Sequence, residues 1–298
     1  PQRWVQALAE VAKHASPGDL QQLPSALQEL VAEVAISEPA KQAYDLLVSA
    51  NKTSVFVGAI AEDHPQASVL HALANFIASA THSNFGIIAQ AGNTAGAWLS
   101  GAVPHRLPAG RVNPNIGLNA TEMLVNSRQV YVLFNLEPEF DFSDAPTAIS
   151  AMQEADFVVM FTPYITEQMR NYTDVILPIA TFAETDGTFI NAEGRWQSVT
   201  KSISAPAEAR PGWRILRVLA NKLGFEDVQY QSCQQIRDEV KALVENCIEP
   251  DSNLSDLNNI NLNLDRENLY RVSSTPIYAV DNVVRRASSL QGTVYEQQ

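Results

Sequence analysis

The chain has 298 residues, of which 46% are hydrophobic and 18% are charged. This apolar share is large enough to build packed cores, and the length suits about two ordinary domains, so wholesale disorder is excluded. The formal net charge of −13 repels phosphate backbones and anionic lipid headgroups. Nucleic acid is therefore not expected as a partner. Direct membrane insertion is not expected either, because no apolar run reaches the roughly 18 residues of a candidate span.

Cysteine and histidine are too few and too scattered for a metal centre. The two cysteines, Cys233 and Cys247, cannot supply the ligands of an iron–sulfur cluster. None of the five histidines has the spacing of a zinc or iron ligand. No Gly-x-Ser-x-Gly elbow is present. The sequence therefore predicts no metal site and no catalytic nucleophile in this chain.

Residues 1–51 have the periodicity of helices. Trp4, Leu8 and Val11 recur at helical spacing, and a second apolar stripe follows them. Ser37 has the position of an N-cap, with Pro39 in the first turn of the next helix. We expect three helices here and no catalytic constellation. The chain begins without Met, directly in an amphipathic helix, which is typical of a piece of a longer polypeptide.

Five short apolar runs follow, and helical patterns separate most of them: residues 55–57, 85–88, 130–134, 157–161 and 175–177. Continuous apolar runs are typical of strands that are buried on both faces, and their alternation with helices predicts parallel β-α-β units. We therefore expect an α/β fold with a doubly wound, mainly parallel sheet. The loops after residues 88 and 134 are expected at the carboxyl edge of that sheet.

The pattern changes again near residue 181. Residues 188–191 and 196–200 predict a small hairpin, in which Gly187 and Gly194 would adopt conformations that a Cβ disfavours. Helices are predicted from Pro211 and after Ser232, and residues 250–268 have no clear period. The predicted division is a helical segment at 1–51, an α/β domain at 52–225 and a C-terminal helix with an extended tail at 226–298.

Two segments have residues that could bind a ligand. In the turn that opens a helix after the second predicted strand, Gly92, Asn93 and Gly96 could present backbone N–H groups to an anion. The turn could equally be structural. Glu184, Thr188, Asn191 and Arg195 lie in a short polar stretch that could bind a polar ligand. The alternative is a hydrogen-bonded loop whose carboxylates pair with the arginine.

The same stretches resemble a known family. Residues 156–159, 173–178 and 184–197 are similar, in order, to the "A-D", "D-V-x-L-P" and "E-x-x-G-T-x-x-N-x-E-G-R-x-Q" signature of the molybdopterin oxidoreductase superfamily. Residues 210–216 resemble the helix entry that follows the signature. The resemblance implies the fold of a pterin-binding domain. It also implies that the seven residues named above occupy vestigial pterin-site positions.

Within that superfamily the chain most resembles the large peripheral-arm subunits of bacterial respiratory complex I, the NADH-quinone oxidoreductase. Residues 92–106 are similar to their "G-A-N-S-A-G-A-W-L-A-G-A-V-P-H-R", and residues 136–141 are similar to their "V-E-P-E-x-D". Residues 276–281, 284–287 and 290–291 resemble their C-terminal end. The resemblance covers nearly the whole chain but only the C-terminal part of such a subunit. The family's iron–sulfur modules lie in the N-terminal part, which has no counterpart here.

The chain also departs from active molybdoenzymes. Leu99-Ser100 replaces an Asp-Met pair, and Glu137-Pro138 replaces an Asn-Pro pair. A carboxylate at that second position would repel the phosphates of a pterin dinucleotide, because two like charges about 4 Å apart cost on the order of 4 kcal/mol at an effective dielectric near 20. The expectation is therefore that molybdopterin is absent and that this chain holds no cofactor.

The resemblance implies that the parent enzyme passes electrons from NADH through FMN and iron–sulfur clusters to quinone. This region would be non-catalytic, peripheral on the cytoplasmic side of the bacterial inner membrane, and in contact with other subunits of the peripheral arm. One alternative is a cofactor-binding fragment of an active molybdopterin oxidoreductase. Another is a stand-alone nucleotide-binding module, which the absence of a dinucleotide fingerprint disfavours. The tail at 270–298 would dock a partner or pack on its own domain.

Overall fold

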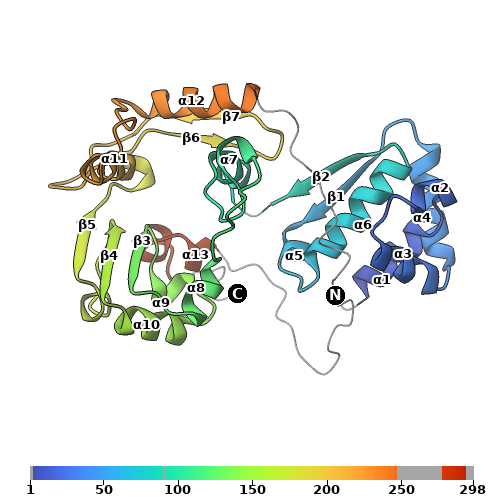
Figure 1. Ribbon diagram of the computed structural model, residues 1–298, viewed down its shortest axis with the longest axis horizontal. Helices are drawn as coiled ribbons and strands as arrows, with labels where there is room; N and C mark the ends of the chain where they lie inside the picture. The colour runs from blue at the N-terminus through green and yellow to red at the C-terminus, as the bar shows by residue number, and fades with distance from the viewer. Residues whose placement is uncertain (1–2, 90, 247–276, 293–298) are drawn as a thin grey trace. The chain divides into compact units, whose positions relative to one another are not determined.

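The computed structural model describes residues 3–89, 91–246 and 277–292 (Figure 1). These residues form two compact units, a first unit up to Thr94 and a second unit from Ala95 onwards. The predicted division at residues 51 and 225 stays a prediction. The predicted loop at 250–268, Cys247 and the beginning of the tail lie outside the described residues. No helix among those described is long and apolar enough to cross a membrane.

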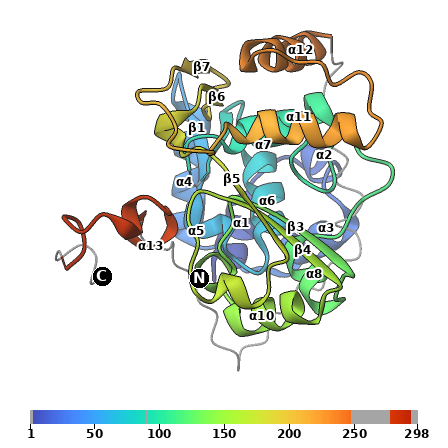
Figure 2. The ribbon, with the colours of Figure 1, turned by 90° about the vertical axis from the view of Figure 1, so that its left-hand side faces the viewer.

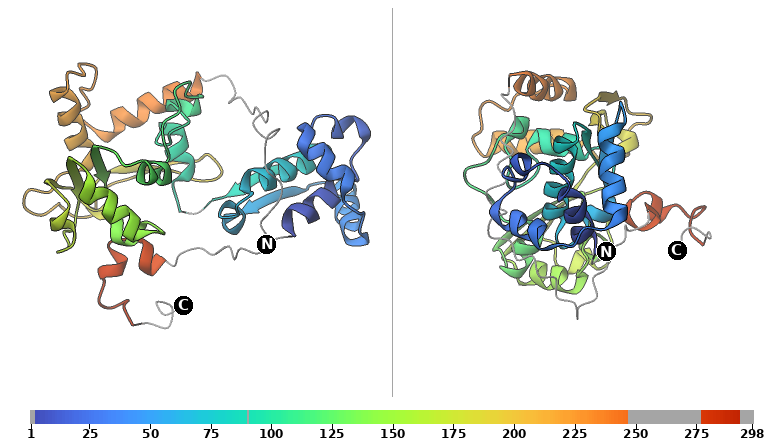
Figure 3. Two further views of the ribbon diagram at one scale, coloured as in Figure 1. Left: turned by 60° about the horizontal axis from the view of Figure 1, so that its bottom comes forward. Right: turned by 90° about the vertical axis from the view of Figure 1, so that its right-hand side faces the viewer.

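The first unit has a helical core, as the sequence predicts, but residues 1–51 form four helices instead of the expected three, because Ser16 caps an additional short helix at Pro17–Leu20. Helices α1 (Trp4–Ala12), α2 (Pro17–Leu20), α3 (Ser25–Glu33) and α4 (Glu38–Ser49) precede the central helix α6 (Ala67–Ala80). Figure 3 shows these helices gathered beside α6. The apolar faces of α1, α3 and α6 share one buried cluster, which includes Val5, Leu27 and Leu73. The hydroxyl of Ser37 accepts a hydrogen bond from the Ala40 N–H and so caps α4, which confirms the predicted start of that helix.

Two parallel strands complete the first unit. Strand β1 (Ser54–Gly58) leads into the short helix α5 (Ala59–Glu62) and pairs with β2 (Asn84–Ile88), so that Val55 is opposite Phe85. The intervening α6 packs on the pair. This is the β-α-β unit that the alternating pattern predicts.

The second unit contains a three-stranded parallel sheet in the order β3-β4-β5. Its strands are β3 (Val130–Phe134), β4 (Phe157–Thr162) and β5 (Val175–Pro178). Helices α8 (Ala120–Val125), α9 (Pro138–Asp141) and α10 (Ala145–Glu154) lie between or before them, and Figure 2 shows α8 and α10 beside the sheet. Tyr131, Val158, Met160 and Met152 pack together in the core between sheet and helices.

The α/β fold class, the mainly parallel sheets and the helical N-terminal part are confirmed. Within the two units, the five predicted strands pair in parallel as β1-β2 and as β3-β4-β5. Helix α6 packs on the pair, and residues of α10 pack on the triplet. In the triplet, the alternate residues Val130, Val132 and Phe134 are exposed on the face opposite to Tyr131 and Leu133.

The remaining elements surround the triplet. They are α7 (Thr94–Ser100), which begins at the unit boundary, the short 3-10 helices η1 (Pro108–Gly110), η2 (Met169–Asn171) and η3 (Phe182–Glu184), the antiparallel hairpin β6 (Gly187–Ile190) and β7 (Trp196–Val199), and the helices α11 (Gly212–Lys222) and α12 (Cys233–Glu245). The C-terminal elements α13 (Ile277–Val280) and η5 (Val284–Arg286) contact each other, and α13 also contacts α9.

Candidate functional site

The carboxyl ends of β3 and β4 form the best-defined polar site among the described residues. In an open parallel sheet, ligands bind in the crevice outside the carboxyl ends of the strands. Asn135 follows β3 in the left-handed region, with φ of 52°, a conformation that asparagine tolerates better than most residues. This turn directs the chain into Glu137, which precedes α9. At the end of β4 the Thr162 hydroxyl donates to the Tyr164 carbonyl oxygen and so turns the chain beside it.

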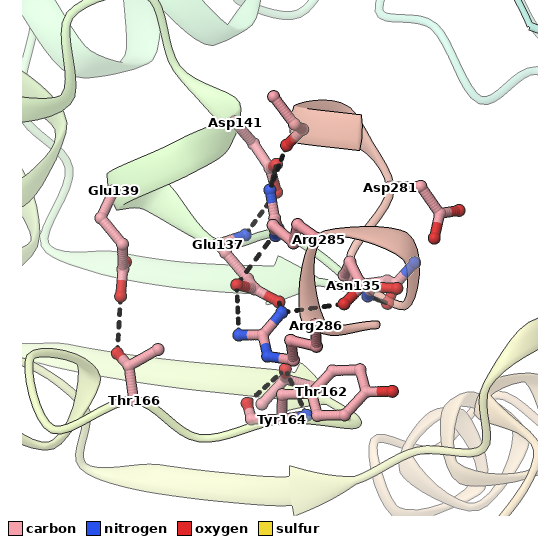
Figure 4. A network of polar contacts seen from close by, with 12 residues as sticks. Asn135, Glu137, Glu139, Asp141, Thr162, Tyr164, Thr166, Asp281, Arg285 and Arg286 are labelled. Atoms are coloured by element: carbon pink, nitrogen blue, oxygen red, sulfur yellow. Dashed lines mark hydrogen bonds and ion pairs between the residues drawn. The ribbon is translucent and has the colours of Figure 1, made fainter. Parts of the chain in front are cut away.

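Glu137 is buried at this edge and forms a bidentate ion pair. Its carboxylate is 1% exposed. The Arg286 Nη1 donates to Oε1 at 2.9 Å, and the Arg286 Nη2 donates to Oε2 at 2.8 Å (Figure 4). The guanidinium also lies over the Tyr164 ring, 4.3 Å from its centroid. Parallel N–H···O bonds with an aromatic face beneath them form the geometry that suits arginine and that lysine cannot reproduce.

Arg285 adds a second cation to the same carboxylate. Its Nη2 lies 3.1 Å from the Glu137 Oε2, as an ion pair without hydrogen-bond alignment. Its Nη1 donates to Asp141 Oδ1 at 3.1 Å and to the Ala279 carbonyl oxygen at 3.0 Å. The Glu137 N–H donates to the other Asp141 oxygen at 2.6 Å. Two carboxylates are therefore balanced by two guanidinium groups.

The turn that carries the arginines is itself fixed to the sheet. Asp281 accepts hydrogen bonds from the N–H groups of Val283 and Val284, which begins η5. The Asn282 side chain donates to the Asn135 side-chain oxygen at 2.9 Å. Residues 281–286, which we call the arginine segment, therefore pack on the second unit, as one of the two predicted alternatives for the tail requires.

Glu139 stabilises the neighbouring loop instead of the arginines. It accepts hydrogen bonds from the Thr166 hydroxyl at 2.6 Å and from the Tyr172 hydroxyl at 2.9 Å. Burial, together with this hydrogen bond to the carboxylate, raises the pKa of Tyr172 above its usual range. Tyr172 therefore stays a neutral hydrogen-bond donor at neutral pH.

The predicted polar stretch is an ordered hairpin with internal hydrogen bonds. The Asn191 side-chain oxygen accepts from the N–H groups of Glu193 and Arg195, at 3.1 and 2.9 Å. Glu184 accepts from the Thr181 N–H at 2.9 Å. Thr188 contacts Ser198 across the strands, through hydroxyl oxygens 3.3 Å apart. The Arg195 Nη2 lies 3.7 Å from Oε2 of the exposed Glu193, as a long ion pair. The four predicted residues are thus close in the chain and engaged in local structure.

The three small predicted residues are divided by the unit boundary. Gly92 and Asn93 end the first unit, whereas Gly96 lies in the second. Gly96 is part of α7, a helix of 7 residues. Whether these seven residues bind a ligand stays a prediction.

The two glycines of the hairpin differ in backbone conformation. Gly194 has φ of 75°, in the left-handed region, as predicted. The prediction for Gly187 is wrong, because its backbone lies outside that region and an added Cβ would meet Val199 at an ordinary 3.8 Å. It is a regular residue of β6.

We expect Gly194→Ala to lower the free energy of unfolding by about 1 kcal/mol, because an alanine Cβ is disfavoured at positive φ. Gly187→Ala is the matched control and should change it by less than about 0.5 kcal/mol. Urea denaturation of both variants tests this difference, and equal effects would contradict it.

Cys233 begins α12 and is partly buried. Burial raises the pKa of its thiol, and the nearby Asp186 carboxylate raises the pKa further. Because the thiolate is the reactive form, we expect iodoacetamide to alkylate Cys233 more slowly at pH 8 than it alkylates free cysteine. Mass spectrometry of the Cys247→Ser variant between pH 7 and 10 measures this rate. A midpoint below that of free cysteine would contradict the prediction.

Among the described residues, no group of three His, Cys, Asp or Glu side chains is placed to hold a metal ion. Residues 6–222 match the sequence model of the molybdopterin oxidoreductase family. The match covers more than half of the chain. The chain belongs to the molybdopterin oxidoreductase family.

Two similar members of the family are formate dehydrogenase subunits. The "F420-dependent formate dehydrogenase 2 subunit alpha" of Methanococcus maripaludis is 34% identical over 137 residues, which is 45% of this chain and 20% of that protein. The "F420-dependent formate dehydrogenase subunit alpha" of Methanocaldococcus jannaschii is 35% identical over 135 residues, which is 44% of this chain and 20% of that protein. The aligned part is therefore about a fifth of these relatives. The superfamily resemblance and the oxidoreductase class are confirmed at this level.

Membership of the molybdopterin oxidoreductase family raises the question of whether the residues fit its cofactor. A polar cavity of about 220 Å³ in the second unit is lined by Glu184, Asp186, Lys201, Arg210 and Arg214, among others. Ligand pockets usually enclose roughly 300–1,000 Å³. Glu184 and Asp186 also accept backbone N–H groups here, from Thr181 and Lys201. At the carboxyl ends of β3 and β4, the buried Glu137 carboxylate is paired with Arg286. The expectation that this chain holds no cofactor stays a prediction.

The most elaborate polar site of this family member is not predicted by its sequence. The family resemblance covers Glu137 (residues 136–141) and the two arginines (residues 284–287) as separate stretches, but it does not predict that they contact one another. One signal is present, namely two adjacent arginines behind an apolar segment in a strongly acidic chain. Their carboxylate partner lies 149 residues before Arg286, at a separation that no periodicity reveals.

Proposed function

We propose that this chain is the C-terminal structural region of a peripheral-arm electron-transfer subunit of the complex I type. The parent enzyme would pass electrons from NADH through FMN and iron–sulfur clusters to quinone. This region would hold neither molybdopterin nor a cluster, and the clusters would lie in the N-terminal part of the parent. It would contact other peripheral-arm subunits on the cytoplasmic side of the bacterial inner membrane.

One observation carries the proposal. Two of the three stretches that resemble the complex I subunit, residues 136–141 and 284–287, meet in the network of Glu137, Asp141, Arg285 and Arg286. Side chains from the two stretches that resemble the complex I subunit therefore contact one another in the folded chain. A network that consumes its own charges holds residues in place, and it offers no nucleophile, no proton relay and no free anion-binding group to a substrate.

The experiment is purification of the complete polypeptide that carries this region, with the proteins that accompany it. The proposal expects a flavoprotein and iron–sulfur subunits to copurify, NADH-dependent reduction of a quinone analogue, and no molybdenum or tungsten by elemental analysis. Near-stoichiometric molybdenum or tungsten together with formate oxidation would overturn it.

A second function is favoured by the relatives. Their names describe formate dehydrogenase alpha subunits, so the chain could be a cofactor-binding fragment of an active molybdopterin oxidoreductase. Gly92, Asn93 and Gly96 would then cradle phosphates, and Glu184, Thr188, Asn191 and Arg195 would contact the pterin. The metal analysis above separates the two functions, because only this one requires molybdenum or tungsten.

A further inference from the structure

The arginine segment occupies the position at which an open parallel sheet usually takes its ligand. It lies outside the carboxyl ends of β3 and β4, where Figure 4 shows Arg286 beside Asn135. The Asn282 side chain donates a hydrogen bond to Asn135, the residue that follows β3. Such crevices bind nucleotides in many doubly wound folds. Here the occupant is a side chain of the same polypeptide.

The contacts of Arg286 are those of a recognised ligand. Both terminal nitrogens of its guanidinium donate to the two oxygens of Glu137, and Nη1 also donates to the Asn282 carbonyl oxygen at 3.0 Å. The Tyr164 ring covers one face. The site therefore matches the plane, the fork and the charge of a guanidinium group. An ammonium ion would satisfy only the charge.

The charges around Glu137 disfavour an anionic ligand. With the Arg286 side chain removed, the buried Glu137 carboxylate would retain one cation, Arg285, which Asp141 already engages. Two carboxylates against one guanidinium leave a net negative site, and a phosphate would meet like charge there.

We propose that Glu137 and Tyr164, at the carboxyl ends of β3 and β4, form a guanidinium-binding site, which the chain's own Arg286 occupies and closes to phosphate-bearing ligands. The site is built by Glu137 and Tyr164 from two adjacent strand ends, with Asp141 holding the second arginine. This assignment does not depend on which redox enzyme contains the chain.

Chemical rescue of Arg286→Ala in the full chain tests the proposal. Methylguanidinium chloride at millimolar concentrations should raise the melting temperature of this variant by several degrees, and the rise should saturate. It should leave the wild type unchanged or slightly lower. Methylammonium chloride has the same charge without the planar fork and should not rescue. Arg170→Ala, which removes an exposed arginine of the same unit, is the matched control and should not respond.

A second set of melting experiments uses inorganic pyrophosphate as an anionic ligand. It should stabilise neither the wild type nor Arg286→Ala. Stabilisation of Arg286→Ala by pyrophosphate, or equal rescue by methylammonium, would overturn the proposal, and so would the absence of any methylguanidinium effect.

A measurement on the wild type covers the case in which Arg286→Ala does not fold. With ¹⁵N-labelled arginine, the guanidinium N–H protons of Arg286 should exchange with water at least tenfold more slowly than those of the exposed Arg128. Exchange of both at similar rates would contradict a held guanidinium. The Arg286→Lys variant lacks this arginine signal and therefore assigns it to Arg286. Because lysine keeps the charge but not the planar guanidinium group, the melting temperature of this variant should stay below that of the wild type.

Discussion

Glu137→Gln should lower the free energy of unfolding by roughly 3–5 kcal/mol, the range for removing one partner of a buried ion pair. The glutamine amide keeps the shape of the side chain but leaves Arg286 and Arg285 without their shared anion. Both guanidinium groups are largely withdrawn from water, since their side chains are 27% and 9% exposed. The loss therefore arises mainly from Arg286, which is left without an anion in a partly buried site, whereas Arg285 keeps its ion pair with Asp141. Urea denaturation of the second unit measures it.

Two comparisons make this prediction specific. Glu154→Gln removes an exposed carboxylate of α10 and should change the free energy of unfolding by less than about 0.5 kcal/mol. In the double variant Glu137→Gln with Arg286→Met, the free energy of unfolding should fall by less than the sum of the two single losses. The reason is that each substitution removes the charge that the other substitution would leave unpaired. Additive losses would show that the pair is not coupled.

Leu73→Ala should be similarly costly in the first unit. Leu73 lies in the middle of α6, is 0% exposed, and belongs to the cluster shared with α1 and α3. Truncation removes buried methyl groups and leaves a cavity, for which losses of about 2–5 kcal/mol are typical. Hydrogen exchange measured by mass spectrometry should report faster exchange in the peptides of α6 and β1.

Leu46→Ala is the matched control for that experiment. It makes the same chemical change on α4, but Leu46 is 68% exposed, so little apolar surface returns to water. We expect the exchange of α6 to stay unchanged in this variant. Equal effects of the two substitutions would show that the assigned core does not stabilise the first unit.

The sequence predicts the strands well and their partners poorly. The runs at 55–57 and 130–134 are apolar at every position, and the strands that form there differ from them by at most one residue at either end. Nothing in those runs tells β1 from β3, because a continuous apolar run has the same pattern whichever strand lies beside it. Periodicity along one segment holds no information about the neighbouring strand.

The candidate site shows the same limit. The motif around Glu184 and Arg195 is local, and a local hairpin with Gly194 at positive φ forms there as predicted. The sequence also locates Glu137 correctly at the end of a strand, but it does not reveal the partner of that charge. Since a carboxylate repels phosphate when alone and binds arginine when paired, its role depends on a contact that only the folded chain shows.

The separation of Glu137 and Arg286 also sets an order of events during synthesis. The two residues are 149 positions apart, and ribosomes add roughly 5–20 residues per second, so the carboxylate emerges on the order of 10 s before its arginine. During that interval β3, β4 and α10 can already assemble, with an uncompensated Glu137 exposed to water at the open edge. The sheet of the nascent second unit is therefore expected to form before the arginine segment can pair with Glu137.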